Sequence, residues 1–481
     1  MTSPTFIGYH IPAIDQSQDG DGVHRLTPVG CGSQMECLIA CSNSRCWSSL
    51  AISLNEYSFG DPQMKIQVKA ALVLLTISIT TAALAGDWPS WRGPNRDGIS
   101  SEKGLLSSWP EDGPKLLWRV DGLGGGFSSV SIVDGKIFTI GKRKGGSELI
   151  ALDIKNGDEL WSTPVGNGNP NCTPTADGNL VFALGRSGNL IAADAQSGSL
   201  VWKKSFGNDF GGKMMSGWGY SESPLVDGEN LIVTPGASDA WMAAIDKVSG
   251  KVVWKSGPED NAFQRGRDGA AYSSVVVSKA QGVKQYIQLT GRGVFGVRAS
   301  DGKFLWSYNR IANGTANIPT PIIKGNYVFC STGYGTGAAL LELKSTDNGG
   351  IEAEEVYFLN ANKFQNHHGG MILVGDYIYC GHGHNKGFPL CLEMMTGEVA
   401  WSGGRGPGSG SAAILQADGH LYFRYENGVM ALIESTAKDY NLKSSFKLAS
   451  NNGRSWPHPV ISDKKLYLRD QQTLLCYDIA K

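Results

Sequence analysis

The sequence is poor in charge and in long hydrophobic runs. Charged residues make up 18% of its 481 residues, and 43 basic side chains stand against 44 acidic ones, a net charge of −1. This balance excludes a chain that binds nucleic acid through bulk basicity. Long amphipathic helical patterns are scarce, and the apolar stretch from Ala70 to Thr81 is too short to span a bilayer comfortably. A helical protein and a membrane-spanning one are therefore both disfavoured.

Cysteine is sparse after residue 85. The cysteines after residue 85 are odd in number and irregular in spacing, so they form no disulfide framework: Cys172, Cys330, Cys380, Cys391 and Cys476. Cys380 and Cys391 fall on neighbouring predicted strands, so a bridge and a pair of buried thiols both remain open. No C-x-x-C-H motif for haem and no adjacent cysteine pair is present.

A secretory signal pattern begins at Met64. Two lysines precede an apolar core, and Ala83-Leu84-Ala85 supplies a small-residue cleavage site. We therefore expect residues 1–63 to be a non-native upstream extension, residues 64–85 to be the signal peptide and 86–113 to be an N-terminal segment. An internal anchor behind a small cysteine-rich domain is the alternative. Cleavage near Ala85 would give a periplasmic or secreted protein with no membrane span. No cysteine stands directly after the cleavage point, which disfavours a lipid-anchored lipoprotein.

What the sequence does contain is a repeat rich in glycine and tryptophan. Five segments read as a strand of alternating apolar residues, a turn with glycine and a second strand that ends in tryptophan: "LIALDIKNGDELW", "LIAADAQSGSLVW", "MAAIDKVSGKVVW", "VFGVRASDGKFLW" and "PLCLEMMTGEVAW". This is the pattern of a β-hairpin. A second hairpin precedes each, as in "SSVSIVDGKIFTIG", so one repeat has four antiparallel strands, A to D. We expect the tryptophans to pack neighbouring repeats together.

The spacing of the repeats predicts the fold. Trp118 to Trp401 covers six intervals that average about 47 residues, near the period of known propeller blades. The last repeat supplies only three strands, and Pro114–Val120 supplies the missing fourth. The sequence thus predicts an all-β, eight-bladed β-propeller over 114–481, with four-stranded antiparallel blades and the last one closed by the N-terminal strand.

Alternating strand direction puts the A–B and C–D turns at one face and the D–A and B–C loops at the other. The second set is long and rich in Gly, Asn, Arg and aromatic residues, so we expect function there. It contains four of the eight histidines, His367, His368, His382 and His384. Three interpretations remain open: a metal site, to which His382-x-His384 could give two ligands; a catalytic or ligand-contacting role for His367 and His368; and structural hydrogen bonding.

Arginines and two tryptophans outside the repeat spacing fall in the same loops. The arginines, which would concentrate anions as a ring, are Arg143, Arg186, Arg265, Arg267, Arg292, Arg310, Arg405, Arg424, Arg454 and Arg469. Trp218 and Trp456 could form a wall on which a quinone or a sugar stacks, or could serve loop packing. We expect this face to bind an anionic or polyhydroxylated small molecule or polymer, and the chain to be a monomer.

The motif A-x-D-x-x-x-G-x-x-x-W resembles the tryptophan-docking repeat of the quinoprotein alcohol dehydrogenases, and it is similar to that of the outer-membrane assembly factor propeller. "DWPSWRGPNRDGIS" with the propeller after it resembles secreted planctomycete proteins, some labelled polyvinyl-alcohol dehydrogenase. The resemblance covers 114–480 and is specific for fold rather than for activity.

The resemblance implies pyrroloquinoline quinone (PQQ) and calcium over this face. The candidates are Trp218 and Trp456 for stacking, Arg292, Arg405 and Arg454 for the cofactor carboxylates, Glu222 and Asn317 for calcium, and Asp268, His367 or His368 as the base. The family's vicinal disulfide has no counterpart here. Two hypotheses follow: an oxidoreductase acting on an alcohol or polyol, and a non-catalytic propeller that binds a glycan, a polymer or an envelope protein.

Overall fold

The computed structural model describes residues 23–26, 37–42, 45–47, 86–258, 263–450 and 452–481. The chain divides into two compact units, Met1–Ala82 and Ala83–Lys481. In the first, β1 (Val23–Leu26), β2 (Cys37–Ser42) and β3 (Arg45–Trp47) form an antiparallel sheet. The predicted signal peptide, 64–85, lies wholly outside the described residues, as does most of the predicted upstream extension.

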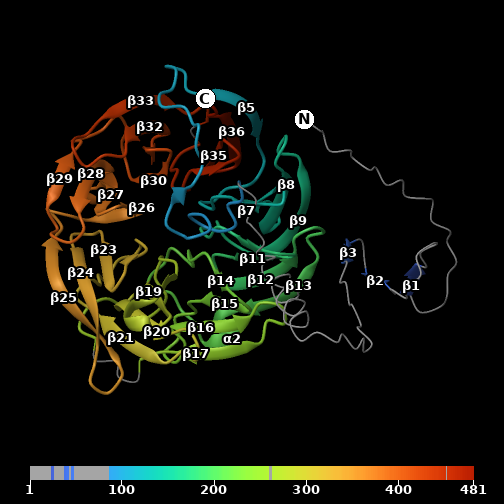
Figure 1. Cartoon of the computed structure of the whole chain (residues 1–481), viewed down its shortest axis with the longest axis horizontal. Coiled ribbons are helices and arrows are strands. Elements are labelled where there is room, and N and C mark those ends of the chain that lie inside the picture. Colours follow the sequence, from blue (N-terminus) through green and yellow to red (C-terminus); the bar gives the residue numbers. More distant parts are fainter. Residues whose placement is uncertain (1–22, 27–36, 43–44, 48–85, 259–262, 451) are drawn as a thin grey trace, which may run out of the picture. The chain divides into compact units, whose positions relative to one another are not determined.

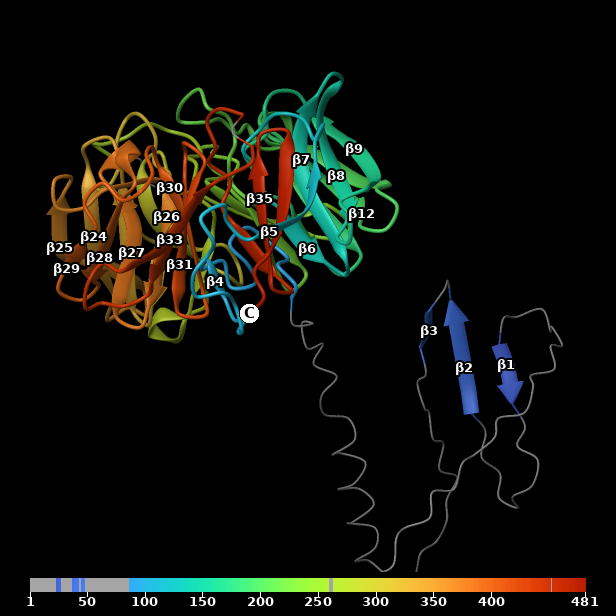
Figure 2. The same ribbon diagram turned by 90° about the horizontal axis from the view of Figure 1, so that it is seen from above.

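The second unit is an eight-bladed β-propeller, which confirms the predicted fold. Figure 1 looks down its axis, and Figure 2 shows its strands from the side. Blades 1 to 4 follow the chain in order: β6 (Ser131–Val133), β7 (Lys136–Arg143), β8 (Gly146–Asp153), β9 (Glu159–Gly166); β10 (Thr175–Asp177), β11 (Leu180–Leu184), β12 (Asn189–Asp194), β13 (Leu200–Ser205); β14 (Leu225–Asp227), β15 (Asn230–Val233), β16 (Met242–Asp246), β17 (Val252–Ser256); β18 (Val276–Ser278), β19 (Gln285–Thr290), β20 (Gly293–Arg298), β21 (Phe304–Tyr308).

Blades 5 to 8 complete the ring: β22 (Ile322–Lys324), β23 (Tyr327–Thr332), β24 (Gly337–Ser345), β25 (Ile351–Asn360); β26 (Asn366–Val374), β27 (Tyr377–His382), β28 (Phe388–Glu393), β29 (Val399–Ser402); β30 (Ala412–Ala417), β31 (His420–Tyr425), β32 (Val429–Glu434), β33 (Leu442–Lys447); β34 (Val460–Ser462), β35 (Lys465–Asp470), β36 (Thr473–Asp478), β5 (Lys115–Val120). In the described part of the propeller, three short helices lie between strands: α2 (Phe206–Phe210), η1 (Ala280–Gly282) and η2 (His384–Lys386). The antiparallel pairing of β36 with β5 closes blade 8, as predicted.

The repeated tryptophan packs against a glycine of the next blade. The ring of Trp161 on β9 lies so close to Gly198 in the C–D turn of blade 2 that a Cβ there would come within 2.5 Å of it. The same contact recurs between Trp118 and Gly157, Trp202 and Gly250, and Trp254 and Gly302. Where the tryptophan is replaced, Tyr357 meets Gly397 and Phe446 meets Gly113. The predicted role in blade packing is thus seen for Trp161, Trp202 and Trp254, and Trp118 of the closing strand makes the same contact.

The segment before blade 1 runs inside the ring, against the inner strands. Trp88 pairs with Ile132 of β6, and β4 (Ile99–Ser100) pairs in parallel with β30. Arg92 donates to the carbonyl oxygen of Met371 on β26, and Arg96 donates to those of Ser223 and Pro224 beside β14. Both guanidinium groups are buried. Residues 86–105 therefore fill part of the axial channel, and we call them the axial segment.

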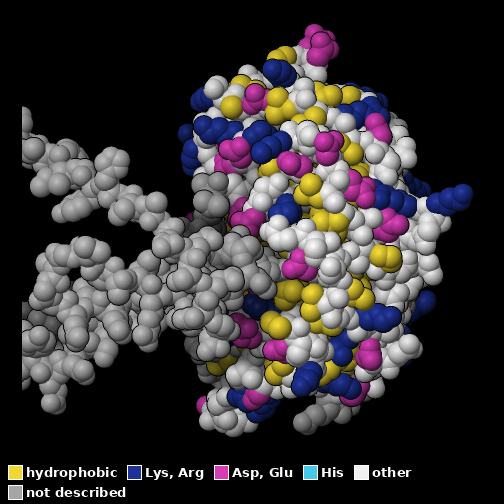
Figure 3. Space-filling view, turned by 90° about the vertical axis from the view of Figure 1, so that its right-hand side faces the viewer, with side chains coloured by type: hydrophobic (Ala, Val, Ile, Leu, Met, Phe, Trp, Pro, Cys, Tyr) yellow, Lys and Arg dark blue, Asp and Glu magenta, His cyan; other side chains and the backbone are white. Residues whose placement is uncertain are grey.

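The outer wall mixes apolar and charged side chains. The outermost strands expose Leu160, Leu200, Val201, Val252 and Val253. On the side shown in Figure 3, hydrophobic side chains are interspersed with charges of both signs. Within the described ranges, no helix combines the length and hydrophobicity that a membrane span requires.

A candidate binding pocket on the propeller axis

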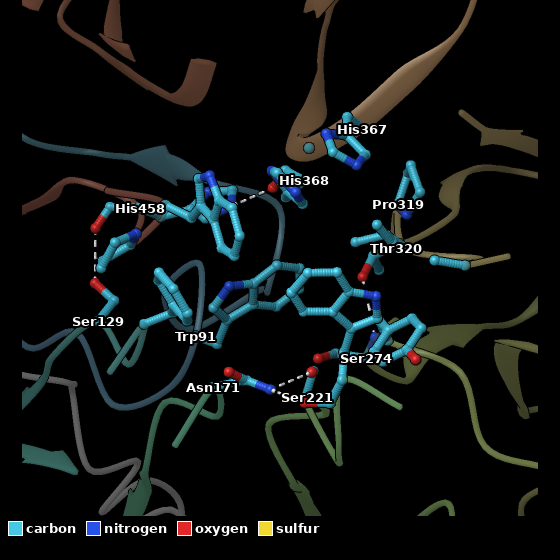
Figure 4. Close-up of a pocket in the computed structure, with 18 of the residues that line it drawn as sticks. Trp91, Ser129, Asn171, Ser221, Ser274, Pro319, Thr320, His367, His368 and His458 are labelled. Carbon is cyan, nitrogen blue, oxygen red and sulfur yellow. Dashed lines mark hydrogen bonds between the residues drawn. The ribbon is translucent and has the colours of Figure 1, made fainter. Parts of the chain in front are cut away.

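A pocket of about 310 Å³ lies on the axis, at the face that carries the D–A loops. Its walls come from the segments before the inner strands of blades 1 to 6 and 8, and Trp91 of the axial segment forms its floor. Figure 4 shows Trp91 within the pocket, with His458, His368 and His367 along one side and Asn171, Ser221 and Ser274 along the other. The predicted long-loop face therefore does hold a pocket.

A chain of hydroxyl groups links five consecutive blades around this pocket. The backbone N–H of Ser129 donates to the hydroxyl of Thr173 at 3.1 Å, that of Thr173 to Ser223 at 3.0 Å, that of Ser223 to Ser274 at 3.0 Å, and that of Ser274 to Thr320 at 3.1 Å. All five side chains are buried and line the pocket. A hydroxyl that accepts one bond still has its own proton to donate. This set of five, which we call the hydroxyl ring, joins the blades. Its four accepting hydroxyls keep a proton to donate, whereas the hydroxyl of Ser129 donates to the carbonyl oxygen of His458 at 2.6 Å.

The histidines enter the pocket through an interruption in blade 6. The register of β26 against β27 passes from the pair Asn366–His382 directly to Met371–Cys380, so residues 367–370 leave the ladder. A Cβ at Gly369 would come within 1.6 Å of the carbonyl oxygen of Ala412, and Gly370 has a φ of +74°. Glycine at both positions lets this bulge lie against blade 7. The bulge carries His367 and His368 toward the axis.

An aromatic column forms one wall of the pocket. Phe127 stacks on Trp456 with ring centroids 4.2 Å apart, and Trp456 lies 4.3 Å from the ring of His368. The column continues through His367, His384 and Tyr334, at centroid distances of 3.5, 4.0 and 4.4 Å. Trp218 meets Trp456 edge-on at 6.5 Å. The structure therefore brings Trp218, Trp456, His367, His368 and His384 together in one pocket.

These histidines are held in the neutral form. Burial, together with a smaller effect of nearby His384, lowers the pKa of His367 to about 3. Burial also lowers the pKa of His368 well below its usual range, and that of His458 to about 3. Both ring nitrogens of His367 have partners, because Nδ1 lies 2.9 Å from the hydroxyl of Ser411 and Nε2 lies 3.1 Å from that of Tyr334. In a neutral imidazole one nitrogen donates and the other accepts, so His367 donates to one of these hydroxyls and accepts from the other.

His382 is set apart from the other three. It does not line the pocket, and its Nδ1 accepts the backbone N–H of Gln365 at 3.2 Å. Nδ1 of His384 lies 3.4 Å from the backbone nitrogen of Tyr334, which donates to it. The described residues contain no group of three or more His, Cys, Asp or Glu side chains that could hold a metal ion.

The pocket lining is almost free of charge. Arg454 is its one cation, and no Asp or Glu is among the described residues that line it. Glu222 turns away between Ser221 and Ser223, because alternate residues of an extended segment face opposite sides. Its carboxylate accepts the backbone N–H and the hydroxyl of Thr234, and burial raises its pKa to about 8. Asn317 is buried and donates to the carbonyl oxygen of Thr290 at 2.9 Å.

The other predicted site residues lie outside this pocket. Asp268 is exposed and pairs with Arg292 at 2.7 Å, an interaction that lowers the pKa of the carboxyl group. Arg405 is exposed in the loop after β29. The structure thus keeps Asp268, Arg292 and Arg405 apart from the histidines and tryptophans of the axial pocket.

The predicted ring of arginines around a solvated funnel is wrong for two members. Arg424 and Arg469 are buried, and their guanidinium groups donate to the carbonyl oxygens of Pro457 and Gly124 at 2.9 Å each. Arg424 and Arg469 lie near the C-terminal ends of β31 and β35, where packing between blades excludes solvent from both side chains. Of the whole predicted set, only Arg454 lines the pocket.

Several pocket residues were not predicted from the sequence. A signal was present for the hydroxyl ring, because a Ser or Thr stands two residues before the start of strand A in each of blades 1 to 5. No repeat pattern marks Trp91, Phe127, Asn171 or Tyr272. Their place depends on how loops and the axial segment pack in three dimensions.

Comparison with known proteins relates the chain to one family and to a fold shared more widely. The family model described as outer membrane protein assembly factor BamB matches residues 102–183 and 166–403. No curated protein matches the sequence. Solved structures that resemble it include BamB from Moraxella catarrhalis, at 13% identity and TM-score 0.52, over 76% of this chain and 99% of that one.

Two dehydrogenase structures are also similar. The quinohemoprotein alcohol dehydrogenase from Comamonas testosteroni has 12% identity and a TM-score of 0.56, over 86% of this chain and 84% of that one. A europium-containing methanol dehydrogenase has 13% identity and a TM-score of 0.58, over 83% and 91% respectively. At these identities the likeness concerns the fold alone.

Proposed function

Because the chain belongs to the BamB family of PQQ-repeat propellers, we propose that it is an exported, non-enzymatic binding protein whose axial pocket takes a neutral polyhydroxylated ligand, a glycan. One observation carries the proposal: the pocket combines aromatic faces with hydroxyl, amide and imidazole groups and only one charged side chain.

The chemistry of the lining matches the chemistry of a sugar. A pyranose ring has apolar C–H faces, which pack on aromatic rings, and equatorial hydroxyls, which need donors and acceptors. Trp91 and the exposed Trp218 supply aromatic surface, while Asn171 and the hydroxyl ring supply polar partners. The imidazoles of His367 and His368, which the lowered pKa values keep neutral, add polar groups to the lining without adding charge. A site of this composition binds through many modest contacts, as expected for a reversible binder.

The alternative is an oxidoreductase that acts on an alcohol or polyol, resembling polyvinyl-alcohol dehydrogenase, with PQQ and calcium. The aromatic column favours a planar cofactor, and similar structures include quinoprotein dehydrogenases. The donor set does not fit that pair of groups. The quinone carries several negative charges, but Arg454 is the one cation in the described lining. Calcium is usually bound by carboxylates and other oxygen ligands, and no Asp or Glu is among the described lining residues. We derive no reaction step for this pocket.

Binding measurements separate the two functions. Purified protein is screened against an array of neutral glycans, and affinity for the strongest one is measured by calorimetry. Asn171→Ala and Trp218→Ala should each weaken binding by about tenfold, which corresponds to ~1.4 kcal/mol. Asn208→Ala, an exposed asparagine on α2, should leave it unchanged. No glycan bound would contradict the proposal. Stoichiometric uptake of PQQ with calcium, followed by alcohol-dependent dye reduction, would establish the alternative.

Export is part of the proposal, and it is supported by the signal pattern before Ala85 and by the family. Mass spectrometry of the N-terminus of the protein from its native cells tests it. A first residue close to Gly86 supports export, and an intact N-terminus at Met1 contradicts both cleavage and the expectation for residues 1–63.

A further inference from the structure

The axial pocket ends blindly. Trp91 closes its inner end, and the ring of Trp91 meets that of His458 edge-on at 5.5 Å. The next residue, Arg92, is buried and anchored to β26, and Arg96 is anchored to the segment before β14. A polymer therefore cannot thread through the propeller along its axis. Only the end of a chain can enter the pocket.

A second hollow begins where the pocket reaches the rim. This cavity, of about 540 Å³, lies between the loops of blades 6, 7 and 8. It shares Asn385 and Arg454 with the axial pocket, so the two are adjacent. Its other lining residues are Ser409, Gly410, Glu426, Asn427 and Gly453. We call this cavity the rim groove.

The rim groove has the composition of a polar path rather than of an apolar cleft. Every residue that lines it is polar, charged or glycine. Its two charges face each other, because Nε of Arg454 lies 3.8 Å from a carboxylate oxygen of Glu426. Polar groups on both sides suit the hydroxyls of an extended sugar chain, which need hydrogen bonds in several directions.

The groove is also preformed and fixed to the pocket wall. The backbone N–H of Glu426 donates to the carbonyl oxygen of Ser411 at 2.9 Å, and that of Asn427 donates to Ser409 at 3.2 Å. The hydroxyl of the same Ser411 lies 2.9 Å from Nδ1 of His367 in the aromatic column. One loop thus shapes both cavities, which keeps their spacing constant.

Building on the proposed function, we propose that the protein binds the ends of polyhydroxylated chains: the axial pocket takes the terminal unit, and the rim groove takes the units that follow it. The blind floor sets the selectivity for ends. The groove adds contacts that a single sugar does not make, so affinity rises with the length of the chain.

The first test counts chain ends. The polysaccharide from which the strongest glycan of the array derives is immobilised intact and, at equal mass, after limited acid hydrolysis. Chain-end binding predicts that the amount of bound protein rises in proportion to the number of ends. An unchanged amount at equal mass would show binding along the chain and overturn the inference, while leaving the proposed function intact.

The second test fills the groove. Ser409→Trp should lower the affinity for a tetrasaccharide to that for the monosaccharide, a loss of about tenfold or more, and should not change the affinity for the monosaccharide. Ser187→Trp is the matched control, since Ser187 is exposed in the B–C loop of blade 2, away from the groove. Equal affinity of wild type and S409W for the tetrasaccharide would contradict a role for the groove. Failure of wild type to bind any glycan would instead remove the proposed function itself.

Discussion

The indole of Trp161 and the backbone of Gly198 belong to neighbouring blades and lie in direct contact. A Cβ on Gly198 would sit 2.5 Å from Cε3 of that ring, and Gly198 has a φ of +73°. Two separate conditions therefore require glycine at this position: the left-handed backbone and the absence of a side chain under the ring. The same pair of conditions recurs along the ring of blades, which explains why the glycine of the hairpin motif and its tryptophan occur together.

We predict that Gly198→Ala destabilises the propeller by about 2–4 kcal/mol, since left-handed strain adds to overpacking against Trp161. Gly178→Ala is the matched control. Gly178 has a φ of +55°, and nothing lies within 4 Å of its added Cβ, so strain alone should cost about 1 kcal/mol. Urea unfolding followed by tryptophan fluorescence measures both. Equal losses would show that the ring contact contributes nothing.

Removal of one hydroxyl from the ring should weaken the join between two blades. In Thr320→Val the backbone N–H of buried Ser274 loses its acceptor, which should cost about 1–3 kcal/mol because an unpaired buried donor remains. Thr320→Ser keeps the hydroxyl and should cost less. Thermal unfolding of the two variants decides. If T320V and T320S are equally stable, the hydrogen bond is not the source of the effect.

The buried histidines predict a loss of stability in acid. The folded protein holds the pKa of His367 and of His458 at about 3, whereas in the unfolded chain both titrate near ~6.5. Above that value neither state binds the proton, so stability is unaffected. Between about pH 6.5 and 3 only the unfolded chain binds it, and each histidine lowers the free energy of unfolding by up to ~1.4 kcal/mol per pH unit.

The measurement is the change in free energy of unfolding between pH 7 and pH 5. His458→Gln should reduce this change relative to wild type, because the unfolded variant no longer gains a proton at that position. His420→Gln, at a partly exposed histidine on β31, provides the comparison. A change as large in H458Q as in wild type would refute the linkage.

The cysteines of the propeller should resist alkylation until it unfolds. Cys172, Cys330, Cys380, Cys391 and Cys476 are buried free thiols, and burial raises the pKa of Cys391 to about 11 and that of Cys476 to about 12. We expect iodoacetamide at pH 8 to label none of them in the native protein and all of them in denaturant without reductant. Peptide mapping would reveal a Cys380–Cys391 bridge as a pair that stays unlabelled until reduced.

The sequence predicted the fold well because the fold is repetitive. Strand alternation, turn glycines and docking tryptophans recur at a fixed period, so each blade supports the assignment of the others. Where the tryptophan is absent, the rings of Tyr357 and Phe446 fill the same position. The histidines at positions 367, 368, 382 and 384 were also assigned to one face, and all of them except His382 line one pocket.

The site was less predictable because most of its residues do not recur at the spacing of the blade repeat. Trp91 reaches the pocket only because the axial segment runs inside the ring. Glu222 and Ser223 are adjacent in sequence, yet one faces Thr234 and the other the pocket. Arg424 and Arg469 read as solvated loop residues, although both are buried in hydrogen-bond networks. Whether such a side chain faces the pocket or the core depends on packing between distant segments, and the sequence around it carries no local signal of that packing.

The position of the axial segment imposes an order on biosynthesis. Residues 86–105 contact strands from blades 1, 3, 6 and 7, yet they leave the ribosome before any of them, and the last blade needs β5 together with the final strands of the chain. Both ends of the segment contact the A–B turn of blade 8, because Ser462 donates to the carbonyl oxygen of Gly86 and the backbone of Asp463 donates to Glu102. Blades that assemble around the segment bury it as they pack, whereas a ring that closed first would have to admit it afterwards. Truncated nascent chains should then remain open and sensitive to protease until translation is complete.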